Sequence, residues 1–460
     1  MGKEVKRMEA DVVVAGGGPG GCTIARELSK KGKRVILVEK GVYSKRFYGS
    51  LLAPVRYMEK YGFLFRTVEG DWIVQGKGIG GGTLIYAGSA FVPHPALWQQ
   101  YGIDITGYMA EAKKDCWVNK APLELVGDGS KRLLSAAQDL GYPWEVIDKF
   151  VDFEKCKADC PMCPYGCPRG AKWTGMVFAE EAEKNGAVLL PKVEIRDVII
   201  ENGMAGGVRG KGSDGKEYEI SSKVVVCAAG GIGTARILKR SGFDDAGKWF
   251  TGDPAIMVFG YFKEGKGGMR DMLFVVGCHD DEHGVTFSNV SGPRLFWSLQ
   301  RFQDKPLRAG NAFLRWGKAI GVMVKISDEL DGQVYLDGRV SKPRTKRDIS
   351  RLEWGATAAE KILVKAGCDP YNIDHSSVIV GHPGATVRVG EMVDSNLETS
   401  VKNLYCCDTS VIPDAFGVPP TLVIVALGKR LSERLETVLE GAPRAERAGE
   451  TAMPTTSGTN

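Results

Sequence analysis

A cluster of cysteines between residues 156 and 167 is the densest set of reactive side chains in this chain of 460 residues. The spacing is C-x3-C-x2-C-x3-C, with a proline directly after the last thiol, and the members are Cys156, Cys160, Cys163 and Cys167. Short loops with glycine and proline can direct several thiolates at one centre, as iron–sulfur ligation requires. Four thiolates also satisfy tetrahedral zinc. The residues alone therefore predict a metal site, either a [4Fe–4S] cluster or zinc.

A glycine-rich turn near the amino terminus predicts a second kind of chemistry, the binding of a dinucleotide. An apolar strand over residues 11–15 runs into the glycines of 16–21, and a helix over 23–31 and a second strand over 34–38 follow. This order of strand, glycine turn, helix and strand is the βαβ unit that binds dinucleotides.

Each position of this turn has a defined physical role. Gly16 permits the tight turn, Gly18 lets the backbone approach a pyrophosphate, and Gly21 lets the helix pack closely on the strand. Glu39, at the end of the second strand, is placed to accept hydrogen bonds from an adenosine ribose. The motif does not decide between NAD and FAD.

Two further glycine clusters follow strand-like segments. The first, over residues 76–83, would let main-chain N–H groups lie against a phosphate or a flat ring. The second, over 228–233, follows a buried strand at 223–227 and leads into a helix that ends at Arg240. It returns the chain to the first sheet.

Hairpin signals place an antiparallel meander between these clusters. A strand is expected from Gly186 into Val193, and Asn202-Gly203 and Asp214-Gly215 predict tight turns between three short strands. Residues 251–374 are expected to form a mainly antiparallel sheet with a helix over 351–366, and the basic stretch 342–347 before that helix is interpreted as solvated. The strands expected in this sheet are 256–262, 272–276 and 319–326.

Composition and charge exclude several classes of protein. Lys and Arg outnumber Asp and Glu by 61 to 56, which is too weak and too dispersed a charge to imply nucleic acid as a partner. The charged first ten residues and the short apolar run after them predict neither a secretory signal nor a membrane span, and hence a cytoplasmic location. Disulfides are then not expected.

The carboxy-terminal segment carries a resemblance to a known family. Its motifs are His382-Pro383-Gly384-Ala385-Thr386, Asn403-Leu404-Tyr405-Cys406-Cys407-Asp408-Thr409 and Gly417-Val418-Pro419-Pro420-Thr421. With the three glycine motifs in the same order, they resemble the glucose-methanol-choline (GMC) FAD-dependent oxidoreductases. The resemblance covers residues 10–95, 185–242 and 375–435.

The resemblance implies an α/β fold in which a Rossmann-like FAD-binding domain, with a parallel sheet and a β-meander, carries an inserted α+β substrate domain with an antiparallel sheet. The FAD domain would comprise residues 1–95, 185–250 and 375–440, the cap domain 96–184 and 251–374, and a disordered tail 441–460. Carried over by position, the flavin-side contacts would be Gly80, Gly81, Gly82 and Thr83, with Val193 on the adenine and Asp408 on the ribityl or pyrophosphate region.

His382 matches the family's active-site histidine, which takes the hydroxyl proton as hydride leaves the substrate carbon. Two positions depart from the family pattern. Pro419 stands where a second catalytic side chain is usual, and Tyr86 lies near the place of an expected asparagine, where it could hydrogen-bond the substrate or simply pack.

The implied activity is oxidation of a CH–OH group in a small alcohol-like or sugar-like molecule. Some family members carry a similar cysteine-rich loop with no cluster implied, so an unmetallated structural loop joins [4Fe–4S] and zinc as an alternative. A cluster would let electrons leave singly to a carrier protein or partner subunit. Two other activities stay open: an electron-transfer flavoprotein that has lost alcohol oxidation, and a flavin reductase acting on a carbonyl or an activated double bond.

Overall fold

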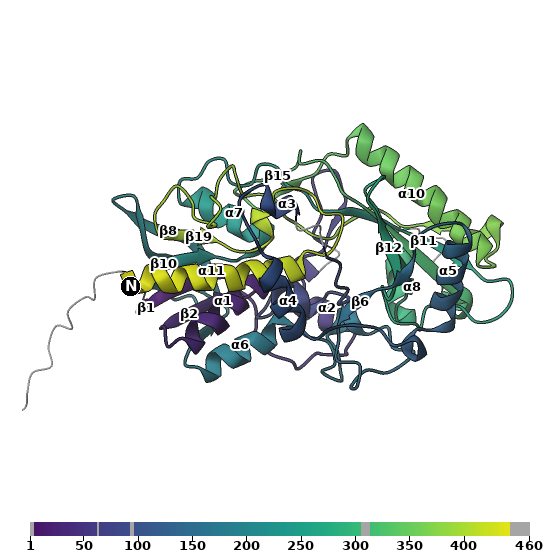
Figure 1. The fold of residues 1–460 in the computed structure, drawn as a ribbon, viewed down its shortest axis with the longest axis horizontal. Helices are drawn as coiled ribbons and strands as arrows, with labels where there is room; N and C mark the ends of the chain where they lie inside the picture. The colour runs from purple at the N-terminus through teal and green to yellow at the C-terminus, as the bar shows by residue number, and fades with distance from the viewer. Residues whose placement is uncertain (1–3, 62–63, 93–95, 305–312, 442–460) are drawn as a thin grey trace, which may run out of the picture.

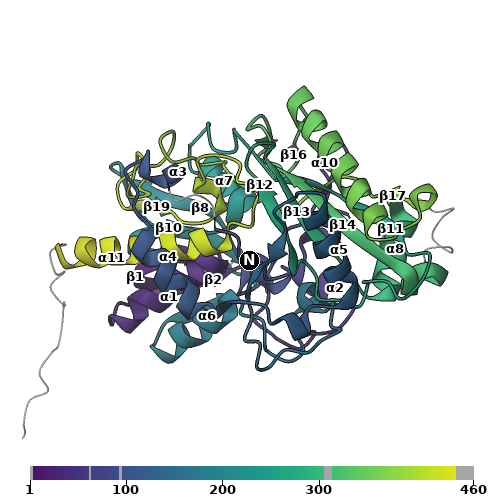
Figure 2. The ribbon, with the colours of Figure 1, turned by 45° about the vertical axis from the view of Figure 1, so that its right-hand side comes forward.

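The computed structural model describes residues 4–61, 64–92, 96–304 and 313–441. Two large sheets dominate it, each covered by helices, and they form two lobes side by side (Figure 1). The turned view in Figure 2 shows the long helices α10 and α11 on different lobes. α11 (Thr421–Gly441) lies along the first sheet and α10 (Lys346–Lys365) along the second.

The first sheet has the strand order β7-β2-β1-β10-β9-β8, with β19 also paired to β10. Its strands are β1 (Val5–Ala15), β2 (Val35–Glu39), β7 (Val188–Pro191), β8 (Val193–Glu201), β9 (Met204–Gly212), β10 (Glu217–Cys227) and β19 (Leu404–Cys406). β7, β2, β1, β10 and β19 run parallel. Val12, Val13 and Val14 are fully buried, which is expected of a parallel strand covered on both faces.

Helices from distant parts of the chain cover this sheet. They are α1 (Pro19–Lys30), α4 (Thr106–Asp115), α6 (Gly175–Lys184), α7 (Gly230–Arg240) and α11. α1 packs against α6 and α11, and α11 packs against α4. The predicted βαβ unit is therefore the centre of the first lobe.

The meander predicted from the hairpin signals is confirmed, with one change. β8 pairs antiparallel with β9, and β9 pairs antiparallel with β10. The first turn places Asn202 and Gly203 in the left-handed region, as a two-residue hairpin of this type requires. The segments around 218–220 and 223–227, predicted as separate strands, form the single strand β10, which pairs with β1 along its length and with β9 over 217–221.

The second sheet has the order β3-β18-β11-β14-β13-β12-β5, with β17 also paired to β11. Its strands are β3 (Trp72–Ile73), β5 (Glu145–Val146), β11 (Pro254–Tyr261), β12 (Val276–Asp280), β13 (Val285–Val290), β14 (Ala319–Ile326), β17 (Asp374–His375) and β18 (Ile379–Val380). The prediction of a mainly antiparallel sheet is confirmed, and the strand expected at 319–326 is β14. The strand expected at 272–276 is wrong, because the strand begins at Val276, and β13 was not predicted.

Helices α5 (Asp128–Asp139), α8 (Arg294–Asp304) and α10 accompany the second sheet. α10 begins earlier than predicted because Thr345 and Asp348 form a capping box: the Thr345 hydroxyl accepts from the Asp348 N–H, and the Asp348 carboxylate accepts from the Thr345 N–H. The remaining short elements are α2 (Ala53–Tyr57), α3 (Ala96–Gln99), β4 (Val118–Lys120), β6 (Asp148–Phe150), β15 (Gln333–Val334) and β16 (Val340–Ser341).

The predicted fold class is confirmed: a parallel sheet with a β-meander, joined to a lobe with an antiparallel sheet. The domain limits stay a prediction, and α4 and α6 of the expected cap segment pack on the first lobe. The predicted disordered tail from 441 lies, after Gly441, outside the described residues. Within the described ranges, no helix combines the length and apolarity that crossing a bilayer would need.

Candidate active site

A cavity of about 480 Å³ lies where the two sheets meet. Ala15 and Ala228, at the carboxyl ends of β1 and β10, form one side, and Met257 and Met323 of β11 and β14 form the other. Ligands of open parallel sheets bind beyond the carboxyl ends of the strands, and the volume is within the roughly 300–1,000 Å³ of small-molecule sites. This cavity is the candidate site.

Gly16 and Gly18 form the cavity wall at the amino end of α1. Gly16 has a φ of +121°, and a Cβ there would lie 2.2 Å from the Ala228 carbonyl oxygen. α1 has no side-chain cap and no acidic residue in its first turn, so its amino end can receive an anion. Gly21 packs behind this wall, where a Cβ would lie 2.1 Å from the Gly16 carbonyl oxygen.

Glu39 faces the same end of the cavity from the end of β2. One carboxylate oxygen accepts from the Gly17 N–H at 2.9 Å, and the other accepts from the N–H groups of Gly41 at 2.7 Å and Gly78 at 3.1 Å. The carboxylate thus joins the first and second glycine motifs. The predicted ribose contact stays a prediction.

The second glycine motif lies directly on the first. The Gly80 N–H donates to the Gly17 carbonyl oxygen at 2.7 Å, and a Cβ on Gly81 would lie 2.7 Å from the Gly18 Cα. Gly81, Gly82 and Thr83 line the cavity, while Gly80 lies behind its surface. Backbone alone can therefore approach a ligand here, as a flat ring requires.

The remaining predicted cofactor residues also line the cavity. Val193 is the first residue of β8 and is buried. Asp408 is buried beside the third motif, where its Oδ2 accepts from the Gly230 N–H at 2.8 Å and from the Thr234 hydroxyl. Burial, the largest influence, raises the pKa of the Asp408 carboxyl despite these donors.

The cavity fits FAD on these observations. One wall of the cavity combines three features: glycines packed against neighbouring backbone, the uncapped amino end of a helix, and an acidic residue at the end of a strand. The residues of this wall come from three separated stretches of the chain. Gly16, Gly18 and Glu39 would hold the nucleotide part, and Gly81 to Thr83 would lie along the flavin.

His382 faces the cavity from the segment after β18, with 29% of its side chain exposed. Its Nδ1 lies 2.9 Å from Oδ2 of Asp253, which directly precedes β11. A carboxylate can only accept, so Nδ1 carries the proton and Nε2 holds the lone pair. Burial lowers the pKa of His382 below its usual 6.5, and the neighbouring Lys325 lowers it further.

Lys325 and Asp253 are site residues that the sequence analysis missed. Lys325 of β14 is 4% exposed in its side chain, and its Nζ lies 3.7 Å from Asp253 Oδ2 and 3.4 Å from His382 Nδ1. Both line the cavity. The available signal was a lysine inside the otherwise apolar strand Ala319–Ile326, since a fully buried lysine needs a partner.

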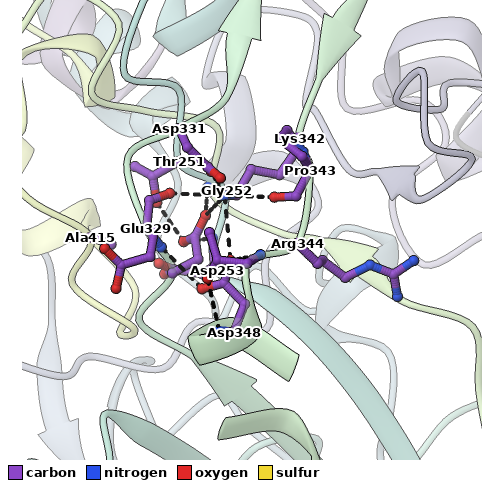
Figure 3. Close-up of polar contacts among 12 residues, drawn as sticks. Thr251, Gly252, Asp253, Glu329, Asp331, Lys342, Pro343, Arg344, Asp348 and Ala415 are labelled. Atoms are coloured by element: carbon purple, nitrogen blue, oxygen red, sulfur yellow. Dashed lines mark hydrogen bonds and ion pairs between the residues drawn. The ribbon is translucent and has the colours of Figure 1, made fainter. Parts of the chain in front are cut away.

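A second layer of charged groups holds the backbone of Asp253. Asp328 accepts from the Asp253 N–H at 3.0 Å and from the Thr251 hydroxyl at 2.5 Å. Lys342 lies 3.3 Å from Asp328. It also contacts Asp331 and, at 3.8 Å, Asp348 (Figure 3). The interpretation of 342–347 as solvated is therefore wrong for Lys342, which is fully buried among carboxylates.

Tyr86 lines the cavity, but its hydroxyl donates to the Trp173 carbonyl oxygen at 2.7 Å, and its ring packs on Phe150. These contacts favour the packing role of the two that the sequence left open. Pro419 also lines the cavity. The geometry therefore places Lys325 and Asp253, rather than Tyr86, beside His382.

The cysteine-rich loop lies against the same cavity, which Pro164 helps to line. Cys163 is buried, and the other three cysteines of the loop are half-buried. Within residues 4–61, 64–92, 96–304 and 313–441, no three His, Cys, Asp or Glu side chains are grouped to hold a metal ion. The predicted [4Fe–4S] or zinc site at Cys156, Cys160, Cys163 and Cys167 is therefore not supported by this arrangement.

Lys172 joins the loop to the cavity wall. Its buried ammonium donates to the carbonyl oxygens of Cys163 at 2.8 Å, Thr83 at 3.0 Å and Tyr86 at 3.0 Å. In the segment from Thr83 to Tyr86, every residue except Leu84 lines the cavity. Lys172 thus positions this segment through its backbone.

Replacing Lys172 with Met should destabilise the protein by about 1–3 kcal/mol, because buried carbonyl oxygens lose their donor. The midpoint of urea unfolding at fixed FAD concentration measures this change. Lys157→Met, at an exposed position of the same loop, is the matched control and should unfold like the wild type. Equal midpoints for the two variants would contradict the positioning role.

Comparison with known proteins identifies the family of this chain and several of its relatives. A family model described as GMC oxidoreductase matches residues 10–256 in its N-terminal part and 324–428 in its C-terminal part. A long-chain-alcohol oxidase of Arabidopsis thaliana is 24% identical, over 95% of this chain and 69% of that protein. An uncharacterized protein of Methanocaldococcus jannaschii is 27% identical, over 91% of this chain and 98% of that protein.

Solved structures share the fold. Pyridoxine 4-oxidase from Mesorbium loti superposes with a TM-score of 0.71 at 15% identity, covering 93% of this chain and 99% of that chain. Formate oxidase from Aspergillus oryzae, in a structure whose subject is FAD modification, superposes with a TM-score of 0.68 at 14% identity. That match covers 95% of this chain and 99% of the oxidase.

Proposed function

This chain belongs to the GMC oxidoreductase family and is an FAD-dependent oxidoreductase, and from that premise we propose that it oxidises the CH–OH group of an uncharged, largely apolar alcohol. The observation that carries the proposal is the pairing of His382 Nδ1 with Asp253 Oδ2 at 2.9 Å. It leaves the Nε2 lone pair of a cavity-lining imidazole for a substrate hydroxyl.

In this proposal, FAD when bound supplies the acceptor for the hydride that leaves the carbinol carbon. His382 accepts the hydroxyl proton at Nε2, and Asp253 keeps the ring in the correct tautomer and stabilises the imidazolium that forms. The Gly417 N–H donates to the other oxygen of Asp253 at 3.1 Å, so the carboxylate is fixed on both sides. The His382 ring is therefore already held in the orientation and tautomer that the reaction requires before the substrate binds.

The wall around His382 supports an apolar substrate. The charged groups beside it are Asp253 and Lys325, which offset each other's charge, and the Thr286 and Ser288 hydroxyl side chains also line the cavity. Sulfur, aliphatic and aromatic side chains make up most of the surrounding surface, namely Met257, Leu273, Phe274, Phe296, Met323 and Ile379. Such a wall favours an apolar substrate, and its two charged groups are already paired with each other. The name of the Arabidopsis relatives, long-chain-alcohol oxidase, agrees with this chemistry.

Reduction of bound flavin by straight-chain primary alcohols tests the proposal. Each added methylene that enters the apolar wall should improve kcat/KM by about fourfold, from roughly 0.8 kcal/mol per buried CH₂, until the wall is filled. The assay follows flavin bleaching anaerobically and then turnover with an artificial dye, so that it does not depend on the natural acceptor.

Glucose and a short hydroxy acid are the matched controls, and both should reduce the flavin poorly. Preferential reduction by either would contradict the apolar substrate. Bound flavin that no alcohol reduces would favour the alternative of an electron-transfer protein. The route of electrons through an iron–sulfur cluster to a carrier is not part of this proposal, because the arrangement of the loop thiols does not support a cluster.

A further inference from the structure

We propose that Lys325 is a positioning residue that neutralises Asp253 and thereby keeps His382 unprotonated, with its Nε2 lone pair available to the substrate. The inference deepens the proposed function and rests on it for the meaning of that lone pair. It also accounts for how the site works with Pro419 at the position where a second side chain was expected.

The geometry makes Asp253 the shared partner of two bases. Oδ2 of Asp253 lies 2.9 Å from His382 Nδ1 and 3.7 Å from Lys325 Nζ. All three side chains line one cavity, and those of Asp253 and Lys325 are at most 5% exposed. Water therefore screens the charges of Asp253 and Lys325 only weakly, and the charge on one group strongly influences the charge on its neighbours.

A buried carboxylate beside a single imidazole raises the pKa of that imidazole and so favours its protonated form, because an opposite charge within about 4–6 Å favours the charged form. A protonated His382 has no lone pair at Nε2 and cannot accept the substrate proton. The ammonium of Lys325 supplies the positive charge that Asp253 requires. It also lies 3.4 Å from Nδ1, where it repels a second positive charge on the ring.

The other titratable groups around His382 are paired within their own elements or with a neighbouring one. His279 of β12 is the next base, and its Nδ1 pairs with the Thr286 hydroxyl of β13 at 2.7 Å. Asp328, after β14, accepts from the backbone of Asp253 and is itself paired with Lys342. Within the described residues, Asp253 and Lys325 are the charged groups recorded as acting on His382. Burial lowers the pKa of Lys325 to about 8, and Asp253 opposes that lowering.

The test measures the protonation of His382 itself rather than turnover. The chain has five histidines, so FAD-loaded protein labelled at histidine Cε1 gives a small set of NMR signals, and His382→Gln identifies the one of interest. In the wild type this signal should titrate below pH 6.5. In Lys325→Met the midpoint should rise by about 1–3 pH units, because Asp253 then has only the imidazole as a partner.

Two results would overturn the inference. A titration midpoint of His382 at or above pH 6.5 in the wild type would overturn it without any variant. This result keeps the test valid even if Lys325→Met does not fold. An unchanged midpoint in a folded, flavin-containing Lys325→Met does so directly, because a purely structural lysine would lower activity without moving the titration. Lys157→Met, on the exposed loop, should leave the midpoint in place.

The outcome is separate from that of the alcohol assay. A shifted midpoint without oxidation of any alcohol would disprove the proposed function and leave the charge coupling intact. Oxidation of alcohols with an unshifted midpoint would disprove the coupling alone.

Discussion

His382→Gln is expected to slow flavin reduction by substrate about 10²- to 10⁴-fold, the usual contribution of a positioned general base. Glutamine keeps a polar side chain of similar length, but its amide nitrogen has no lone pair for a hydroxyl proton. Anaerobic stopped-flow reduction of the bound flavin measures the change directly. Flavin content should stay at the wild-type level, because the glycine motifs and Glu39 are untouched.

His283→Gln is the matched control. That ring stacks on Trp354 at 3.8 Å and is not part of the cavity wall, so reduction should proceed at the wild-type rate. A His382→Gln protein that keeps more than about a tenth of the wild-type rate would refute the base assignment.

The same reaction should depend on pH with a defined sign. The base acts when neutral, and its pKa lies below the usual 6.5 because burial disfavours the imidazolium. The reduction rate should therefore stay on its plateau down to about pH 6.5 and fall only as pH drops below that value. A plateau that begins only above pH 7 would contradict the assigned environment of His382.

The parts of the fold that were predicted correctly are the parts encoded locally. Strand 11–15, the glycines after it and the turn at Asn202-Gly203 are each encoded by local sequence, because a continuously buried strand is a short apolar run and positive φ favours glycine or asparagine. The single strand β10 escaped prediction because β1 pairs with it along its whole length, while β9 pairs only with its first part and β19 only with its end. That is a tertiary property.

The missed part of the site arises from long-range contacts. Asp253, Lys325 and His382 come from three segments, and neither Asp253 nor Lys325 lies in a recognisable motif. The basic stretch 342–347 is typical of a solvated surface by residue type, whereas Lys342 pairs with carboxylates that only the folded chain brings together. Residue type indicates that a buried lysine needs a partner but not which one.

Lys342→Met should have the largest effect on stability, a loss of about 3–5 kcal/mol, because it leaves buried carboxylates without their cation. The side chains of Asp328 and Asp348 are fully buried, and they lie 3.3 Å and 3.8 Å, respectively, from Lys342 Nζ. Lys342 Nζ also donates to the Glu329 carbonyl oxygen at 2.8 Å, and Figure 3 shows Lys342 with Glu329 and Asp348. Even with Lys342 present, burial raises the pKa of Asp328 to about 7, so removing the lysine would favour a neutral Asp328 still further.

The urea midpoint at fixed FAD concentration measures this loss, with Lys346→Met, an exposed lysine of the same basic stretch, as the control. Adding Asp328→Asn to Lys342→Met should recover part of the stability, because an amide at this position needs neither the cation nor a bound proton to be neutral. The loss should also reach the active site, since Asp328 holds the Asp253 N–H at 3.0 Å and Asp253 orients His382. A stability loss below about 1 kcal/mol, or a double variant no better than the single one, would mean that the carboxylates do not depend on Lys342 and that Asp253 is held by its other contacts.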